Sequence, residues 1–385
     1  MAPQGKIANS TEEDESIDTS DRSAVVNSVL NILETKEHFS NIKALEQGTF
    51  GDVHLMFDPQ RLSSVAVKIV TSKAEQELEF WPSLEHENIV PLLEVMTLSS
   101  MKVSVFVMPV YESSLNEMVF RSQFRKRHDA FGMMKTWIYQ SLCGLEYLHD
   151  NNLCHLDIKA DNVLLCQESG AKICDFSFIN TAKKSLTSYD VGLPYIYRPP
   201  EACLSANVSF DGKAFDAWSF GVMVAEIFTH FYLNNNLTKD DFFWLDDIYP
   251  TLYEILQDDT FACLMSKTLL HISEEQAARS LALNFIQAFL TVDCSKRMNI
   301  AEAKSHPFMK KKSTLRMEPD PIWKRKISVS MEEFNQKFIK GFEKCDQSPF
   351  EEKLFSGDEF YTQPISGNGA SLVNSTLLTP DYTRC

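Results

Sequence analysis

The residues best suited to chemistry in this 385-residue chain lie in one polar stretch, His155 to Asn162, and at the acidic residue Asp175. Asp157 is a carboxylate that can accept a proton from a hydroxyl group, and Lys159 can neutralise negative charge beside it. Asn162 and Asp175 supply hard oxygen atoms of the kind that Mg²⁺ binds together with phosphate oxygens. Because phosphoryl transfer depends mostly on positioning and charge stabilisation, these residue types point to that reaction.

The order and spacing of this set resemble the catalytic loop of eukaryotic protein kinases, H-R-D-x-x-x-x-N, followed by a D-F-G-like magnesium motif. The loop here runs from His155 to Asn162, and the second motif reads Asp175-Phe176-Ser177. One carboxylate alone is more often a solvated loop residue or a helix cap. The ordered set at kinase spacing is far more specific than any of its members.

The resemblance implies a role for each residue of the set. Asp157 would orient the substrate hydroxyl and accept its proton, and Lys159 would stabilise the charge of the phosphoryl group in transfer. Asn162 and Asp175 would hold Mg²⁺. Because Lys159 follows Asp157 in the arrangement of serine/threonine kinases, the resemblance implies transfer of the γ-phosphoryl group of ATP to Ser or Thr of protein substrates.

A turn between two strand-like segments, Glu46 to Val53, resembles the kinase glycine-rich loop, G-x-G-x-x-G-x-V. In that loop, backbone N–H groups approach the phosphates of ATP. Gly48 and Gly51 stand at two of the glycine positions, and Glu46 replaces the first glycine. Alone, this stretch would be no more than a hairpin turn. We expect the bulk and charge of Glu46 to weaken ATP binding.

Lys68 lies within an apolar, strand-like run, residues 65–70, where a lysine is costly unless it is paired. By resemblance its partner is Glu77, on a helix whose glutamate holds the lysine on the α- and β-phosphates of ATP. Glu75 and Glu79 do not share a helix face with Glu77, because helical neighbours are three or four residues apart. The plainer alternative for Lys68 is a surface ion pair.

A second apolar run, residues 103–108, leads into Pro109-Val110-Tyr111, which resembles the hinge between the two lobes of a kinase. By resemblance Met108 is the gatekeeper, and the adenine of ATP hydrogen-bonds to the Pro109 carbonyl and the Tyr111 N–H. Proline keeps its carbonyl acceptor although it has no N–H. The resemblance assigns further contacts with the nucleotide to Val53, Ala66 and Leu164. The bland alternative is a core strand that ends in a proline turn.

Residues 175–201 resemble an activation segment, whose end, Tyr197 to Glu201, is closest to the form found in cyclin-dependent-kinase-like enzymes. Asp216, in a D-x-W-S-x-G segment, is expected to cap the backbone of the catalytic loop. Arg297 is expected to pair with Glu201. Four hydroxyls stand at candidate phosphorylation positions, although polar loops contain hydroxyls in any case: Ser185, Thr187, Ser188 and Tyr189.

The resemblance implies an α+β fold of two lobes, a small β-rich N-lobe and a larger, mainly helical C-lobe. We expect a kinase domain over residues 37–308, with the lobes at about residues 37–108 and 112–308. An acidic, largely disordered extension over residues 1–36 precedes it, and a partly disordered tail over residues 309–385 follows.

Both extensions leave alternatives open. Apolar residues at helical spacing predict a helix at residues 21–36, with Asp21 or Ser23 as its cap. This helix either packs on the domain that follows or binds a regulatory partner. The tail over residues 309–385 carries scattered aromatic residues, so it either folds back on the small lobe or remains disordered.

Four departures from the kinase pattern bear on activity. Leu156 replaces the arginine that reads activation-loop phosphate, which predicts weak dependence on such phosphorylation. Ser177 replaces the D-F-G glycine, Pro194 replaces a threonine near the catalytic residues, and Glu46 was described above. None of them removes a metal or proton-transfer ligand, so an active kinase is favoured over a pseudokinase scaffold. The segment ending at Glu201 disfavours a small-molecule kinase.

Composition excludes several classes of protein. A net charge of −16 argues against a general nucleic-acid or anionic-membrane binder, since both need a basic surface. The nine cysteines show no C-x-x-C pair, which favours reduced thiols in an intracellular protein. No apolar run of about 18 residues and no signal-peptide layout is present. We therefore expect a cytoplasmic or nuclear protein with no membrane or nucleic-acid partner.

Overall fold

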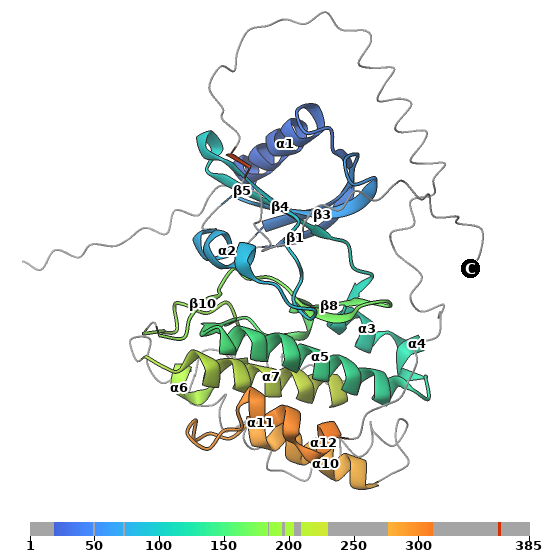
Figure 1. Cartoon of the computed structure of the whole chain (residues 1–385), viewed down its shortest axis with the longest axis vertical. Helices are drawn as coiled ribbons and strands as arrows, with labels where there is room; N and C mark the ends of the chain where they lie inside the picture. Colours follow the sequence, from blue (N-terminus) through green and yellow to red (C-terminus); the bar gives the residue numbers. More distant parts are fainter. Residues whose placement is uncertain are drawn as a thin grey trace, which may run out of the picture.

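The structure is a computed structural model, and Figure 1 shows its two lobes, a β-sheet with one covering helix and a larger layer of helices. It describes residues 19–48, 51–71, 74–183, 185–194, 197–203, 209–229, 276–310 and 361–362. The predictions for residues 1–18 and for most of the tail lie outside this part of the chain. The predicted α+β architecture of two lobes is confirmed.

The small lobe is built on one antiparallel sheet with the order β1-β2-β3-β5-β4-β11. Its inner strands are rich in valine, isoleucine and other residues that suit a pleated surface. The strands are β1 (Ser40–Gly48), β2 (Gly51–Asp58), β3 (Ser63–Val70), β4 (Glu94–Leu98), β5 (Val103–Pro109) and β11 (Tyr361–Thr362). Strands β2, β3 and β5 carry the predicted glycine-rich turn, the lysine and the hinge, so the sheet positions all three.

The inner strands β2, β3 and β5 bury side chains on both of their faces, whereas β1 is largely exposed. In β3, Val65, Val67 and Ile69 join one apolar cluster, while Ala66 and Val70 join another. This alternation follows from the period of two residues in a strand. The face that carries Ala66 also carries Lys68 and is directed toward the large lobe.

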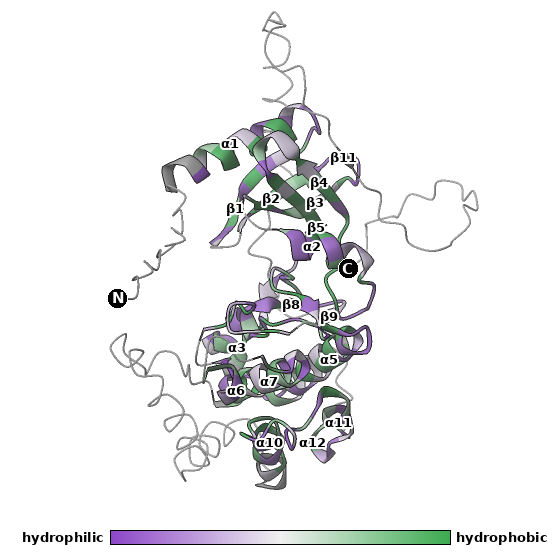
Figure 2. Ribbon diagram, turned by 90° about the vertical axis from the view of Figure 1, so that its left-hand side faces the viewer, coloured by the Kyte–Doolittle hydropathy of each residue, from purple (hydrophilic) through white to green (hydrophobic). Residues whose placement is uncertain are grey.

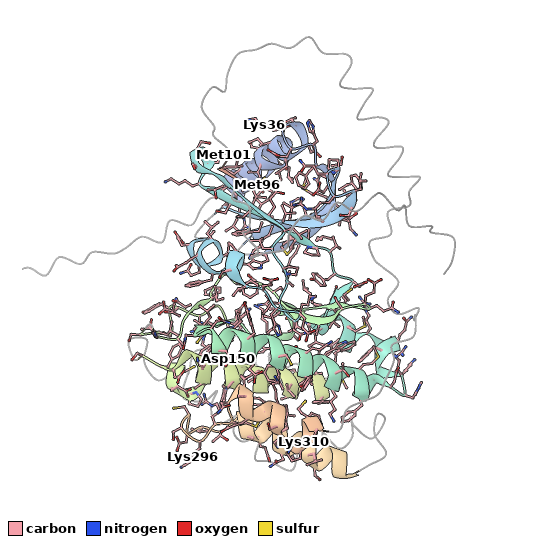
Figure 3. All side chains as sticks on the ribbon, viewed as in Figure 1. Lys36, Met96, Met101, Asp150, Lys296 and Lys310 are labelled. Atoms are coloured by element: carbon pink, nitrogen blue, oxygen red, sulfur yellow. The ribbon has the colours of Figure 1, made fainter. Side chains whose placement is uncertain are left out.

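Helix α1 (Thr19–Thr35) covers the opposite face, as Figure 2 shows with α1 and α2 on the two sides of the sheet. The helix buries four apolar side chains at helical spacing, Val26, Val29, Leu30 and Leu33. Lys36 follows the helix in Figure 3, where Met96 marks β4 and Met101 marks the turn that links β4 to β5.

The start of α1 differs from the sequence-based expectation. The described part of the helix already includes Thr19, so neither Asp21 nor Ser23 is its cap, and that prediction is wrong. An acidic residue such as Asp21 also suits the first turn of a helix, because it complements the helix dipole. The same sequence is therefore compatible with the earlier start.

Two short helices and the large lobe follow. Helix α2 (Glu75–Phe80) and the turn η1 (Trp81–Ser83) lie on the Lys68 face of the sheet.

The large lobe is mainly helical. Its long helix α5 buries Trp137, Ile138 and Leu142, and nearly all of α7 is buried. The helices of this lobe are α3 (Leu115–Phe120), α4 (Ser122–Arg125), α5 (Ala130–Asp150), α6 (Pro200–Cys203), α7 (Gly212–Thr229), α10 (Gln276–Phe289), α11 (Ile300–Ser305) and α12 (Pro307–Lys310).

Short strands between these helices carry the chemistry-bearing loops. They are β6 (Ser113–Ser114), β7 (Leu153–Cys154), β8 (Val163–Cys166), β9 (Gly170–Ile173) and β10 (Asn180–Thr181). Antiparallel pairing of β8 with β9 brings the end of the catalytic loop next to the start of the Asp175 motif. In the described residues, the cysteines form no disulfide, and no helix combines the length and the apolar character needed to cross a bilayer.

The tail contributes one described element. Strand β11 pairs with the outer edge of β4, with Tyr361 opposite Thr97 and Thr362 opposite Met96. Figure 1 shows this strand beside α1 at the top of the small lobe. This pairing matches the alternative in which the tail folds back on the small lobe.

Candidate active site

The backbone of the catalytic loop is held by Asp216 at the start of α7. Its Oδ2 accepts a hydrogen bond from His155 N and its Oδ1 accepts one from Leu156 N, both at 2.8 Å. His149 Nε2 lies 3.0 Å from the same carboxylate. Leu156 has a positive φ of 64°, a strained conformation for a leucine that these bonds maintain. The predicted capping role of Asp216 is confirmed.

Asp157 lies at the centre of this loop with only 1% of its surface exposed. Asn162 Nδ2 donates to the Asp157 carbonyl at 2.8 Å and to Asp157 Oδ2 at 2.6 Å. Lys159 Nζ lies 3.0 Å from Oδ2 and 3.2 Å from Oδ1 of the same carboxylate. The loop therefore brings together the proposed base, the cation beside it and one proposed metal ligand.

Asp175 is tied to this group through the backbone. Cys174 N donates to the Asn162 carbonyl at 3.0 Å, and Asp175 itself has a φ of 63°. Phe176 is fully buried, with its ring centroid 5.5 Å from that of His155 and 5.4 Å from that of Trp81. The buried phenylalanine thus anchors the motif while the strained aspartate turns back toward the site.

Lys68 connects the two lobes. Its Nζ lies 2.6 Å from Glu77 Oε1 and 2.9 Å from Asp175 Oδ1. Glu77 is 1% exposed, so the surface ion pair considered for Lys68 is wrong and the buried pair with Glu77 is present. Among the described residues of α2, Glu77 bonds the lysine and Glu75 and Glu79 do not, as helix geometry predicts.

Ser177 adds a contact that the sequence analysis did not foresee. Its Oγ donates to Asp175 Oδ1 at 2.6 Å and accepts a hydrogen bond from Lys68 Nζ at 3.0 Å. The residue that replaces the glycine of the motif therefore belongs to the polar cluster. The sequence signal for this contact was the hydroxyl of Ser177, which stands two residues after Asp175.

Burial and charge set the protonation states of these groups. Burial raises the pKa of Asp157, and the Lys159 ammonium opposes this shift. For Asp175, burial would raise the pKa, but Lys68 and the Ser177 hydroxyl outweigh it and hold the pKa well below the usual range. For Lys68, burial would lower the pKa, but the carboxylates of Asp175 and Glu77 raise it instead. At neutral pH Lys68 is a cation and Asp175 an anion.

The glycine-rich turn lies against Lys68. Gly48 and Gly51 are paired across β1 and β2. A Cβ added at Gly51 would lie 3.3 Å from Lys68 Cε and 3.1 Å from the Ile69 carbonyl, so a larger residue would crowd the lysine. Burial and then the charges of Asp175 and Asp161 raise the pKa of Glu46 on the same turn. The carboxylate of Glu46 therefore lies within electrostatic reach of the catalytic groups.

The residues assigned to the adenine contribute to one apolar surface. Ala66 and Met108 are paired across β3 and β5 and belong to the core beneath the sheet. Three other residues are half-buried and pack against this core, Val53, Tyr111 and Leu164. Pro109 ends β5 and is also half-buried. Their placement on the Lys68 side of the sheet suits a flat, apolar group.

The end of the activation segment is fixed to the large lobe. Arg297 forms two parallel bonds with Glu201, Nη1 to Oε1 at 2.6 Å and Nη2 to Oε2 at 3.0 Å. The predicted pair is confirmed. Earlier in the segment, Thr187 Oγ1 donates to Asp190 at 3.0 Å, and Tyr189 is 78% exposed.

The donor set fits a magnesium ion. Asn162 uses its Nδ2 for both bonds to Asp157, and its Oδ1 accepts no hydrogen bond from the part of the chain that the structure describes. Asp175 uses Oδ1 toward Lys68 and Ser177 and keeps Oδ2. One or two such oxygens together with phosphate oxygens are the usual Mg²⁺ ligands at nucleotide sites.

Comparison with known proteins agrees with this geometry. A family model described as the protein kinase domain matches residues 39–309. The chain belongs to the protein kinase family. A probable serine/threonine-protein kinase from Dictyostelium discoideum is 25% identical over 87% of this chain and 38% of its own length. Mitogen-activated protein kinase 2 from Arabidopsis thaliana is 26% identical over 72% of this chain and 78% of its own length.

A third relative, cyclin-dependent kinase G-2 from Oryza sativa subsp. indica, is 31% identical over 56% of this chain and 31% of its own length. The chain thus spans well under half of the Dictyostelium and rice relatives. The predicted membership of the protein kinase superfamily is confirmed by the family model.

Proposed function

We propose that this protein kinase is active and transfers the γ-phosphoryl group of ATP to Ser or Thr of protein substrates. The observation that carries the proposal is the double contact of Lys68 with Glu77 and Asp175. This contact joins β3, α2 and the Asp175 motif into one cluster. Because Lys68, Glu77 and Asp175 are already in contact, the proposed reaction requires no large movement of these residues.

Asp157 is the proposed base. Its Oδ2 accepts bonds from both Asn162 and Lys159, whereas Oδ1 accepts only the longer bond from Lys159 within the described residues. We therefore propose Oδ1 as the atom that takes the proton of the substrate hydroxyl while the hydroxyl oxygen bonds to the γ-phosphorus and ADP leaves. The raised pKa of Asp157 suits a proton acceptor.

In this proposal, two lysines offset the negative charge of the phosphates. Lys68 is held at the β3 end of the cluster, where it would position the α- and β-phosphates of ATP. Lys159 is held on Asp157 and would offset charge on the transferring group. Mg²⁺ bound by Asn162 and Asp175 would neutralise phosphate charge and orient it for in-line attack. Glu46 adds a carboxylate near the same phosphates, which supports weaker ATP binding than a glycine there would give.

The side chain of Leu156 is fully buried in the core of the large lobe. A leucine in this position offers no cation to phosphate on the activation segment, which supports weak dependence on such phosphorylation.

Pro194 is exposed, and its carbonyl accepts a hydrogen bond from Tyr197 N. A regulatory protein partner, the domain limits and a cytoplasmic or nuclear location stay predictions.

The test is phosphate transfer from radiolabelled Mg·ATP to a mixed library of Ser and Thr peptides, with Asp157→Asn as the control. We expect the variant to lose about 10²- to 10⁴-fold in kcat, because it lacks the proton acceptor, and to keep ATP binding. Calorimetric titration with Mg·ATP measures that binding separately. ATP binding without transfer by the unaltered protein would leave a pseudokinase scaffold, the alternative function for this fold.

A further inference from the structure

Helix α1 lies outside the residues that match the protein kinase domain, yet one of its side chains reaches the glycine-rich turn. Arg22 Nη2 donates to the Gly48 carbonyl at 2.6 Å. Arg22 Nε donates to Asp52 Oδ2 at 3.2 Å, and Nη2 lies 3.1 Å from the same oxygen. One guanidinium therefore contacts the last residue of β1 and the second residue of β2.

These contacts span the base of the turn. Gly48 pairs with Gly51 across the two strands, and Asp52 follows Gly51 directly. Gly51 in turn lies against the side chain of Lys68. The guanidinium thus fixes the two strand ends whose position decides where the turn lies relative to the lysine.

Arg22 and the proposed phosphate site lie on opposite faces of β2. Asp52 and Met56 pair with Ile69 and Val65, which belong to the cluster covered by α1. Val53 pairs with Lys68 on the opposite face. Arg22 therefore does not line the proposed nucleotide site, and it acts on the turn from behind the sheet.

The contact is well anchored. Asp52 is only 7% exposed, and a buried carboxylate needs a partner to offset the loss of its hydration. The side chains of Val26, Val29 and Leu33 hold α1 on the sheet, which fixes the direction from which Arg22 approaches. The turn itself carries two glycines, which leave the unrestrained backbone with many conformations.

We propose that Arg22 is a positioning residue for ATP, so that the N-terminal extension completes the nucleotide site. The inference rests on the proposed function, in which the N–H groups of the turn approach the phosphates. By restraining Gly48 and Asp52 before ATP arrives, Arg22 lowers the entropy lost when these two strand ends are ordered beside the nucleotide. A purely structural role for Arg22 would stabilise α1 and leave the affinity for ATP unchanged.

The experiment compares Arg22→Ala with Arg61→Ala in the full chain. Arg61 is a matched control, because it pairs with Asp58 and Glu94 in the same sheet and does not contact the turn. Calorimetry gives the Kd for Mg·ATP, initial rates give KM and kcat, and thermal unfolding gives stability. For Arg22→Ala we expect Kd and KM to rise about fivefold to tenfold, with kcat changed by less than about twofold.

Further variants keep the test decisive. Arg22→Lys retains the charge and one donor, so it should recover part of the affinity. If Arg22→Ala fails to fold, Asp52→Asn weakens the same contact, and it should raise the Kd for Mg·ATP in a folded protein. A lower Tm with unchanged Kd in these variants, or an equal rise in Kd for Arg61→Ala, would overturn the inference. No Mg·ATP binding by the unaltered protein would instead overturn the proposed function.

Discussion

The hydroxyl of Ser177 sets this site apart from the glycine-containing motif that it resembles. Asp175 keeps one carboxylate oxygen on Lys68, and in the proposed site it would offer the other to Mg²⁺. Ser177 Oγ bonds both Asp175 and Lys68, so it limits rotation of the carboxylate. The same hydroxyl contributes to the lowered pKa of Asp175. Ser177 therefore fixes the orientation of the Asp175 carboxylate, the proposed metal ligand, and also restricts the backbone.

Replacement of Ser177 tests this account. In Ser177→Ala the carboxylate of Asp175 loses one hydrogen bond of about 1 kcal/mol, so its orientation is less restricted. We expect the Mg²⁺ concentration for half-maximal phosphate transfer to rise about threefold to tenfold. Ser177→Thr retains the hydroxyl and serves as the control. Equal Mg²⁺ dependence in the alanine variant and the unaltered protein would contradict the role given to the hydroxyl.

Sequence spacing predicted those residues of the site that lie close in the chain or follow a shared family pattern. Asp157, Lys159 and Asn162 meet because one tight loop carries them. A lysine in an apolar run needs a partner, and the resemblance to kinases named Glu77 as that partner. The roles of Ser177 and Arg22 were not predicted. Their contacts join segments up to 109 residues apart, or depend on the angle at which α1 crosses the sheet.

At the scale of elements, α1 and β2 enclose a buried histidine. His54 pairs with Val67 on the face covered by α1, and it is 6% exposed. Neither ring nitrogen has a hydrogen-bond partner among the described residues. Burial lowers the pKa of His54, and the nearby carboxylate of Asp52 opposes the shift. The helix therefore packs best on a neutral imidazole, and the apolar period that predicted α1 gave no sign of this polar residue beneath it.

The stability of the small lobe should depend on pH through His54. Because its folded-state pKa lies below the ordinary value of 6.5, the unfolded chain binds more protons in acid. The favourable contribution is complete above about pH 6.5 and is lost as the pH falls toward the folded-state pKa. Urea unfolding at a series of pH values measures the effect.

His54→Leu is the matched variant, because it fills the buried position with an apolar side chain and removes the titrating group. Burial also lowers the pKa of His86 and His306, so both proteins should lose stability in acid. We expect a smaller loss in His54→Leu. Parallel curves for the two proteins would show that the helix does not depend on the charge of His54.

At the scale of the whole molecule, a few long-range ion pairs join segments that local structure does not connect. Lys68 and Asp175 are 107 residues apart and link the lobes. Arg297 and Glu201 are 96 residues apart and fix the activation segment to the helices of the large lobe. The layers of sheet and helix were predictable from apolar periodicity and the family pattern, whereas the cap and length of α1 and the edge strand β11 were not, since packing decides them.

Loss of Arg297 should weaken the large lobe more than its single charge suggests. Its side chain is 1% exposed, and its Nη1 also donates to the Ala214 carbonyl at 2.8 Å. Arg297→Ala removes several bonds of a buried cation and leaves Glu201, which is 21% exposed, without its partner, so the free energy of unfolding should fall by about 2–3 kcal/mol. Lys296→Ala is the control beside it, because the pair of Lys296 with Asp293 is solvent-exposed and should change stability little. Urea unfolding of both variants measures the two losses in stability. Similar midpoints would mean that Arg297 contributes no more than a surface charge.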